Sequence, residues 1–390
     1  KIEEVFRIIE VLESIGVKIR WIGKDLEIKR PSKLKLDSMD KEAAKRTRSV
    51  LMFLGPLIHE YKTFKIPYAG GCKLGTRTVQ PHLFALEKFG VDIVAKNKHY
   101  NVSVKIKDAG EVVLYEAGDT VSENALMAAA GRPKETIIDM ATSNYMVREV
   151  AHYLQALGVK VEGVGSHTMK VKGVKSINKN ITYAPSEDPI ESMMFISLAV
   201  TTNSAITIKR CPIDFLKLEL LKLEKMCVKF DISKKYKADN GVTDLVDIKM
   251  HKHEGLVSLE DKIHPMPYPG INIDNLPFFV PIATQAKGRT LIHDWVYDNR
   301  AIYFTELNKL GASITLADPH RVYVDGPTKL SGADIVSPDA LRPAVIVLIG
   351  MLAAKGRSTL RNVYSINRGY EDLANRLNKL GAKITVIRDL

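Results

Sequence analysis

The chain has 390 residues, of which 45% are hydrophobic and 26% are charged, and its formal net charge is +12 at pH 7. This composition is typical of a globular protein, and the longest apolar run, Ala344 to Ala354, is too short to cross a bilayer, so a membrane-spanning chain is excluded. The positive charge indicates either anionic partners or a solvated, lysine-rich surface.

Cysteine usage and the start of the chain bear on its compartment. The three cysteines, Cys72, Cys211 and Cys227, form neither a disulfide framework nor a paired metal motif, which favours a reducing cytoplasm. No secretory segment is visible, and we therefore predict a cytoplasmic protein. A start at Lys1 rather than Met is compatible with a processed, tagged or truncated N-terminus.

One pattern returns six times along the chain: a helix, a Leu, a Gly four residues later, and an alternating strand. It occupies residues 12–19, 86–93, 154–161, 223–230, 307–314 and 377–384. The helix stops are Gly16, Gly90, Gly158, Cys227, Gly311 and Gly381, in steps of 74, 68, 69, 84 and 70 residues. Gly suits such a stop because it adopts left-handed backbone without a Cβ penalty. A period near 70 residues exceeds that of solenoid repeats and predicts six copies of one supersecondary unit.

The length of the chain predicts how these copies are grouped. A chain of 390 residues exceeds what one hydrophobic core usually organises. We therefore predict two domains of three units each, residues 1–186 and 187–390. The sequence is also compatible with a first domain whose N-terminal part has been truncated.

The segment 67–82 is the most unusual local sequence, with three glycines in six positions and no periodicity. It predicts a loop that presents Cys72 between Lys73 and Arg77, just before a helix. Positive neighbours and a helix N-terminus both favour the thiolate, so Cys72 is a candidate reactive cysteine. The alternative is a small apolar filler, as free cysteines commonly are.

Four arginines stand where a loop meets a predicted helix: Arg48, Arg300, Arg342 and Arg368. Bidentate guanidinium donors and unpaired helix N–H groups are both suited to phosphate and carboxylate recognition. Each arginine alone is more typical of an ordinary surface position. Their recurrence in separate repeats favours convergence on one anionic ligand.

Several longer motifs resemble the enolpyruvyl transferases over nearly the whole chain. They are GGCKLGTR at 70–77, SENALMAAA at 122–130, TQAKGRTLIHDWVYDNR at 284–300 and INRGYEDLANRLNKLGAKI at 366–384. The Gly-Gly-Cys loop separates the chain from the shikimate 3-phosphate branch, and the branch that acts on UDP-N-acetylglucosamine is the most similar. The resemblance implies an α/β (α+β) fold, a two-domain inside-out α/β barrel of six βαβαββ repeats, three per domain, which closes over substrate.

The resemblance also implies an activity, the transfer of the enolpyruvyl group from phosphoenolpyruvate to the 3-hydroxyl of UDP-N-acetylglucosamine in peptidoglycan synthesis. Neither a metal nor another cofactor is implied. Cys72 would be the acid toward C3 of phosphoenolpyruvate, Asp274 the base, and Arg368 the third catalytic residue. The implied substrate-binding residues are Arg48, Arg77, Gln80, Asp119, Thr120, Asn299, Arg300 and Arg342. From its own sequence context, Asp274 is also compatible with a helix N-cap.

Departures from the family pattern leave alternatives open. Gln80 and Pro81 replace an Asp-containing segment. Glu116 and Asp119 lie in the segment that usually offers a Lys and Ser-Val-Gly-Ala to the nucleotide phosphates, so two carboxylates would repel a diphosphate. Asp188-Pro189 lacks the usual Arg, and the family's early Lys-Asn pair would precede Lys1. One alternative is a different sugar or nucleotide acceptor. Another is a non-catalytic relative that binds an anion or nucleic acid, as the RNA 3′-terminal phosphate cyclases share a related fold. The absence of an aromatic stacking platform weakens the nucleic-acid interpretation, and the oligomeric state stays open.

Overall fold

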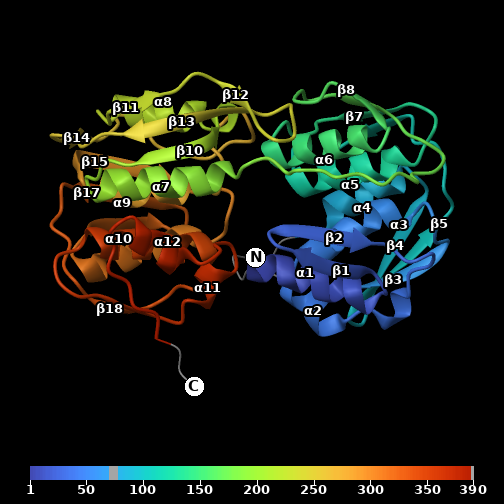
Figure 1. Ribbon diagram of the computed structural model, residues 1–390, viewed down its shortest axis with the longest axis horizontal. Helices are drawn as coiled ribbons and strands as arrows, with labels where there is room; N and C mark the ends of the chain where they lie inside the picture. Colours follow the sequence, from blue (N-terminus) through green and yellow to red (C-terminus); the bar gives the residue numbers. More distant parts are fainter. Residues whose placement is uncertain (70–77, 388–390) are drawn as a thin grey trace. The chain divides into compact units, whose positions relative to one another are not determined.

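The structure is a computed structural model, and it describes residues 1–69 and 78–387 (Figure 1). The chain divides into two compact units, the first ending at Tyr183 and the second beginning at Ala184. The sequence boundary at 186 and 187 lies three residues further along. Each unit mixes helices and strands, so the predicted α/β class is confirmed at that level.

The first unit contains α-helices, short 3-10 helices and strands. Its helices are α1 (Glu3–Ser14), η1 (Leu36–Ser38), α2 (Lys41–Arg46), η2 (Ser49–Phe53), α3 (Leu54–Leu57), α4 (Gln80–Glu87), α5 (Asp119–Ala130) and α6 (Tyr145–Ala156). Its strands are β1 (Lys18–Ile22), β2 (Asp25–Lys29), β3 (Thr63–Pro67), β4 (Val91–Lys96), β5 (His99–Val104), β6 (Glu111–Val113), β7 (Thr136–Asp139), β8 (Lys160–Glu162) and β9 (Met169–Lys172). They form the sheets β1-β2, β3-β5-β4 and β6-β7-β9-β8.

The second unit is built from the same kinds of element. Its helices are α7 (Pro189–Thr201), η3 (Ile213–Phe215), α8 (Lys217–Lys225), η4 (Leu276–Phe278), α9 (Phe279–Ala283), η5 (Arg300–Leu310), α10 (Leu341–Ala353), α11 (Tyr364–Asn367) and α12 (Leu373–Lys379). Its strands are β10 (Thr207–Pro212), β11 (Phe230–Ile232), β12 (Tyr236–Lys237), β13 (Asp244–Met250), β14 (Leu256–Val257), β15 (Ala286–His293), β16 (Ser313–Asp318), β17 (Arg321–Gly326), β18 (Asp334–Val336) and β19 (Thr359–Arg361). They form β10-β13-β11 with β12 beside β13, β14-β15-β17-β16, and β18-β19.

Two of these sheets, one in each unit, have the same topology. In the first unit the chain runs β6, α5, β7, α6, β8, β9, and in the second it runs β14, α9, β15, η5, β16, β17. In both, the first two strands are parallel and the other pairings are antiparallel. The strand order and pairing therefore match between these two sheets, with the 3-10 helix η5 in the place that α6 has in the first unit.

All six predicted helix stops adopt left-handed backbone, which confirms that part of the repeat. Their φ values run from 66° at Cys227 to 101° at Gly381. At five of the six stops, the residue after the stop donates its N–H to the carbonyl of the pattern's Leu, as Val17 does to Leu12 at 3.1 Å. Strands follow five of the stops, whereas residues 382–387 form no strand in the described chain.

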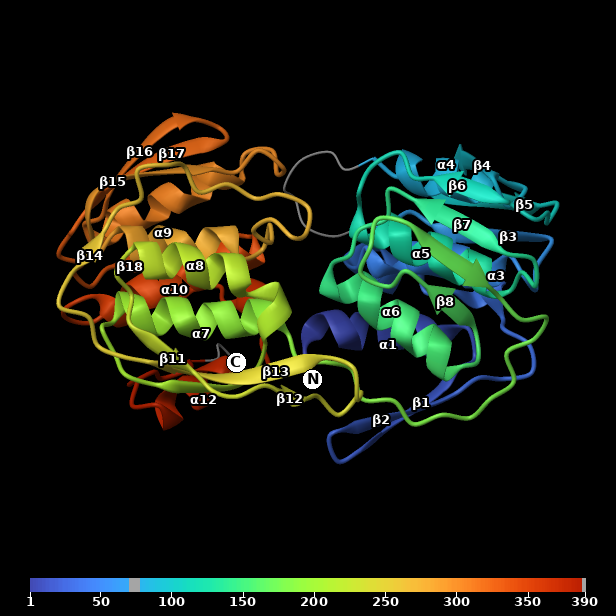
Figure 2. The same ribbon diagram turned by 90° about the horizontal axis from the view of Figure 1, so that it is seen from above.

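Apolar helices form the cores of the units. In the first unit α5 packs against α3, α4 and α6, and Figures 1 and 2 show α5 beside α6 (teal). In the second unit α7 and α10 pack against each other and are buried along most of their length. A helix that is apolar on every side is buried, so the apolar run from Ala344 to Ala354 is explained by the buried position of α10. Within the part of the chain that the structure describes, no helix is both long and apolar enough to cross a membrane.

Cys227 supplies a stability prediction because it is the one stop that is not Gly. Its φ of 66° places a Cβ in the left-handed region, which costs roughly 1–2 kcal/mol, whereas Gly costs about 0.5–1 kcal/mol in the unfolded chain. Cys227→Gly should therefore raise the free energy of unfolding by up to about 1 kcal/mol. Thermal unfolding measures the change. Cys227→Ala is the matched control, because it removes the thiol and keeps the Cβ, and an equal gain in that variant would contradict the backbone explanation.

Candidate functional site

The predicted site residues come from both units. Cys72 and Arg77 lie outside the described residues, so their predicted roles stay predictions. In the first unit, Arg48 precedes η2 and its Nη2 donates a hydrogen bond to the carbonyl oxygen of Thr78, at 3.0 Å. Gln80 is the first residue of α4 and is exposed. Arg48 therefore lies close to the start of α4.

Asp119 begins α5, and its carboxylate is held by neutral donors. The hydroxyl of Thr142 donates to Oδ1 at 2.6 Å, and the side-chain amide of Asn144 donates to Oδ2 at 2.9 Å. Thr142 and Asn144 belong to the connection between β7 and α6. The Asp119 carboxylate therefore ties the start of α5 to this connection, whereas the Glu116 side chain is exposed.

Next to these residues lies a buried polar network that the sequence analysis missed. Asn124 is fully buried; its Nδ2 donates to the carbonyl of Leu51 at 3.0 Å, and its Oδ1 accepts from the N–H of Gly55 at 2.9 Å. Asn124 Nδ2 also lies 2.9 Å from Nδ1 of His82, whose Nε2 is 3.3 Å from the hydroxyl of Thr120. Burial, with a smaller contribution from Arg48, lowers the pKa of His82 to about 4, so the ring is neutral. The sequence signal that could have revealed this network is the single Asn in the largely apolar segment SENALMAAA at 122–130.

Glu123 supplies a pH prediction. Burial, and then the nearby Asp119 carboxylate, raise its pKa to about 8, while an unfolded Glu titrates near pH 4.3. The folded state holds the proton between these values, so this contribution to stability is complete below about pH 4, falls as the pH rises and is lost by about pH 8. Glu123→Gln should match wild type at pH 5 and exceed its free energy of unfolding by about 1–3 kcal/mol at pH 9.

Urea unfolding at pH 5, 7 and 9 measures the Glu123 effect. The exposed Glu135→Gln is the control for loss of a carboxylate on the same unit. A difference between Glu123→Gln and wild type that does not change with pH would contradict the assignment.

In the second unit, Asp274 lies between two arginines. Its Oδ1 is 3.6 Å from Nη1 of Arg300, and its Oδ2 is 3.5 Å from Nη2 of Arg342. The Asp274 side chain remains 30% exposed, so the carboxylate is open to a ligand. The N-cap alternative does not hold, because the cap of η4 is Asn275, and no side-chain cap bond is present there. Asp274 has the charge environment and exposure of a candidate base.

Arg300 is buried beneath Asp274 and bound by protein groups. Its guanidinium pairs with the fully buried Asp294 and donates from Nη2 to the carbonyl of Ile273 at 2.7 Å. It also lies 4.3 Å from the ring centroid of Tyr297. Only 1% of the Arg300 side chain is exposed. In this structure Arg300 therefore braces Asp274, and its predicted contact with substrate stays a prediction.

Arg342 is the second residue of the buried helix α10, and its side chain remains 14% exposed. Its Nη1 donates to the hydroxyl of Tyr370 at 3.0 Å, and burial raises the pKa of Tyr370 well above its usual value. Arg368 directly follows α11, two residues before Tyr370. Asn299, which was also predicted to bind substrate, is exposed and has a φ of 61°, in the left-handed region that Asn tolerates. The structure thus brings Asp274, Arg300 and Arg342 into one cluster.

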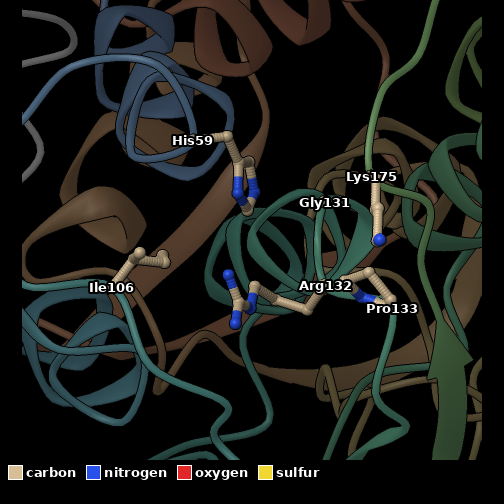
Figure 3. Close-up of a pocket in the computed structure, with 6 residues that line it drawn as sticks. All are labelled: His59, Ile106, Gly131, Arg132, Pro133 and Lys175. Carbon is tan, nitrogen blue, oxygen red and sulfur yellow. The ribbon is translucent and has the colours of Figure 1, made fainter.

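A separate pocket of about 370 Å³ opens at the opposite end of α5 (Figure 3). Its lining residues are His59, Ile106, Gly131, Arg132, Pro133 and Lys175. At about 1.5 Å per residue, the helix separates this pocket from Asp119 by roughly 16 Å. Arg132 is already paired with Asp108, and the C-terminal end of a helix disfavours anions. The pocket is therefore distinct from the predicted substrate residues. Across residues 1–69 and 78–387, no group of three or more His, Cys, Asp or Glu side chains could hold a metal ion.

The family model and similar known proteins agree on one family. The family model of EPSP synthase (3-phosphoshikimate 1-carboxyvinyltransferase) matches residues 1–377. UDP-N-acetylglucosamine 1-carboxyvinyltransferase of Treponema denticola is 33% identical, covering 98% of this chain and 88% of the relative. The protein of the same name from Bradyrhizobium diazoefficiens is 31% identical, covering 98% of this chain and 87% of that relative.

Solved structures share the fold. The enolpyruvyl transferase NikO from Streptomyces tendae aligns with a TM-score of 0.81 at 22% identity, covering 98% of this chain and 87% of that chain. EPSP synthase from Acinetobacter baumannii aligns with a TM-score of 0.72 at 17% identity, covering 97% of this chain and 88% of that chain. With the family model matched over 1–377, the chain belongs to the EPSP synthase family and is an enzyme of the enolpyruvyl transferase class.

Proposed function

We propose that this enzyme transfers the enolpyruvyl group of phosphoenolpyruvate to the 3-hydroxyl of UDP-N-acetylglucosamine and releases phosphate, the first committed step of peptidoglycan synthesis. The observation that carries the proposal is the relationship to proteins of that name, 33% and 31% identical over 98% of the chain. These substrates would place the reaction in the cytoplasm. We also propose that each unit is an inside-out barrel of three βαβαββ repeats, supported by the three sheets described in each unit.

The chemistry assigns a task to each proposed residue. The hydroxyl oxygen bonds to C2 of phosphoenolpyruvate while its proton passes to Asp274, and the Cys72 thiol protonates C3. The bond from C2 to the phosphate oxygen then breaks, C3 returns a proton to the Cys72 thiolate, and the double bond re-forms. Fixed positive charge must stabilise the carboxylate and phosphate during both steps. Arg342 and Arg368 are the proposed donors in the second unit, with Arg48 and Arg77 from the first.

A two-substrate assay tests the proposal. Wild-type protein is incubated with phosphoenolpyruvate and UDP-N-acetylglucosamine, inorganic phosphate is followed with time, and the carboxyvinyl nucleotide sugar is identified by mass spectrometry. Phosphate release should require both substrates. Release without any acceptor, or no release in the presence of both, would contradict the proposed reaction.

A second candidate acceptor is favoured by one observation, the exposed Glu116 near the start of α5, where the family usually has a Lys. An enolpyruvyl transferase with a different sugar or nucleotide acceptor would not need to tolerate this carboxylate beside a diphosphate. A panel of sugar nucleotides and free sugars in the same assay distinguishes the two candidates, because turnover with another acceptor alone would replace the first.

Glu116→Lys should strengthen the binding of UDP-N-acetylglucosamine. Replacing a repulsive carboxylate by an ammonium near a partly desolvated diphosphate is worth about 1–3 kcal/mol, or roughly ten- to a hundredfold in Kd. Calorimetry of wild type and variant measures the change, with the exposed Glu135→Lys as a control for added charge on the same unit. Equal strengthening by both variants would assign the effect to net charge rather than to Glu116.

A further inference from the structure

A buried carboxylate lies behind the loop that carries Asp274. Glu219 is in the first turn of α8, and its side chain is 2% exposed. A carboxylate is costly to bury unless hydrogen bonds compensate. Burial raises the pKa of Glu219, and its bonds to Asn275 and Asn272 oppose that rise. The side chain therefore occupies a site built for an acceptor.

The acceptor contacts of Glu219 go to the residues on either side of Asp274. Its Oε1 accepts from the backbone N–H of Asn272 at 3.2 Å and from the side-chain amide of Asn275 at 2.9 Å. Asn275 is completely buried, so removing its partner would leave this amide without compensation. Through these two bonds, helix α8 fixes both ends of the four-residue segment 272–275.

Two further hydrogen bonds within this segment hold the backbone at Asp274. The side-chain Oδ1 of Asn272 accepts the N–H of Asp274 at 2.8 Å, and the N–H of Asn275 donates to the carbonyl of Asn272 at 2.9 Å. From the other side, Arg300 donates to the carbonyl of Ile273. The backbone of Asp274 is thus bounded by hydrogen bonds before and after it, and Glu219 anchors the side facing α8.

We propose that Glu219 is a positioning residue, which holds the 272–275 segment so that the Asp274 carboxylate stays at the geometry that proton abstraction requires. The inference rests on the proposed function, in which Asp274 is the base. A base must lie within hydrogen-bond reach of the proton it removes, and a misplacement of about 1 Å can cost a hundredfold in rate. Glu219 itself is buried and acts through Asn272 and Asn275.

Two variants separate the acceptor from the charge of Glu219. Glu219→Gln keeps a carbonyl oxygen that can accept both bonds, and its kcat should stay within about threefold of wild type. Glu219→Leu keeps a similar volume and removes the acceptor, and its kcat should fall about ten- to a hundredfold. Because Asp274 is misplaced rather than lost, KM for phosphoenolpyruvate should change less than about twofold. The pH dependence of kcat should also shift in Glu219→Leu and not in Glu219→Gln.

Asn272→Ala is a second variant that disturbs the fold less, because Asn272 is only partly buried. It removes the side-chain oxygen that accepts the N–H of Asp274, which is the next hydrogen bond in the series that starts at Glu219. It should show the same loss of kcat with unchanged KM. Thermal unfolding identifies any variant that is not folded. A folded Glu219→Leu or Asn272→Ala with wild-type kcat and pH profile would overturn the inference.

Amide hydrogen exchange of the segment 270–278 in the full-length protein gives a readout that does not depend on turnover. The amides of Asp274 and Asn275 should exchange about tenfold faster in Glu219→Leu, with other segments unchanged. Unchanged exchange would overturn the inference even in an active enzyme. Absence of phosphate release from wild type would instead contradict the proposed function, and the exchange result would then still decide whether Glu219 holds the loop.

Discussion

Asp274→Asn is expected to lower kcat for enolpyruvyl transfer about a thousandfold, because the amide cannot accept the hydroxyl proton and general base catalysis contributes about 10²–10⁴-fold. The variant keeps the shape of the side chain between Arg300 and Arg342. Binding of the nucleotide sugar should therefore remain within a few fold of wild type. Initial rates of phosphate release and calorimetry measure the two quantities.

The exposed Asp261→Asn serves as the matched control for Asp274, because it removes a carboxylate elsewhere in the same unit. It should leave kcat unchanged. If Asp274→Asn retained more than about a tenth of wild-type kcat while folded, Asp274 would not be the base, and the proton would have to pass to another group.

Cys72→Ala is expected to lower kcat by about 10²–10⁴-fold, because no other thiol can protonate C3 from that loop. Cys72 should also be the first cysteine alkylated by iodoacetamide or fosfomycin, and its labelling should accelerate when a sugar nucleotide is bound. Burial raises the pKa of Cys211 to about 11, which makes that thiol inert. Cys227 is exposed and is therefore the relevant competitor.

Mass spectrometry of labelled peptides decides the order of reaction. Cys227→Ala provides a background in which labelling of Cys72 is measured without this competitor. Labelling of Cys227 at the same rate as Cys72 in wild type would remove the evidence for a thiolate. Full activity in Cys72→Ala would show that another group is the acid.

Local features of the fold were predictable from the sequence, because their causes lie within a few residues. The left-handed stop at Gly16 follows from a helix, a Gly and an alternating strand, and the hydrogen bond from Val17 to Leu12 spans only five positions. The buried helix α10 was visible as an apolar run for the same reason. The strand that the pattern predicted after Gly381 is wrong, since residues 382–387 form no strand, and the 3-10 form of η5 was not predicted; both depend on packing rather than on local pattern.

The supports of the candidate site were not predictable, because their partners are far apart in the sequence. Glu219 meets the side chain of Asn275 across 56 positions, and Asn124 meets the N–H of Gly55 across 69. A single sequence shows Glu219 only as a charged residue on a lysine-rich helix. The family resemblance identified Asp274 and the loop–helix junction identified Arg342, and the fold supplied the buried acceptor Glu219 that holds the Asp274 loop.

The matching topology of the β6–β9 and β14–β17 sheets places two acidic residues in corresponding positions of the chain. Asp119 is the first residue of α5, which follows β6, and Asp274 lies after β14 and just before η4 and α9. Asp119 accepts hydrogen bonds from Thr142 and Asn144 in the connection before α6, and Asp274 lies near Arg300, the first residue of η5. Such correspondence is what duplication of one ancestral segment leaves behind. In the first unit the Asp119 carboxylate accepts hydrogen bonds from Thr142 and Asn144, whereas in the second unit the Asp274 carboxylate lies beside Arg300 and Arg342. The candidate base therefore has a carboxylate counterpart at a matching topological position in the first unit.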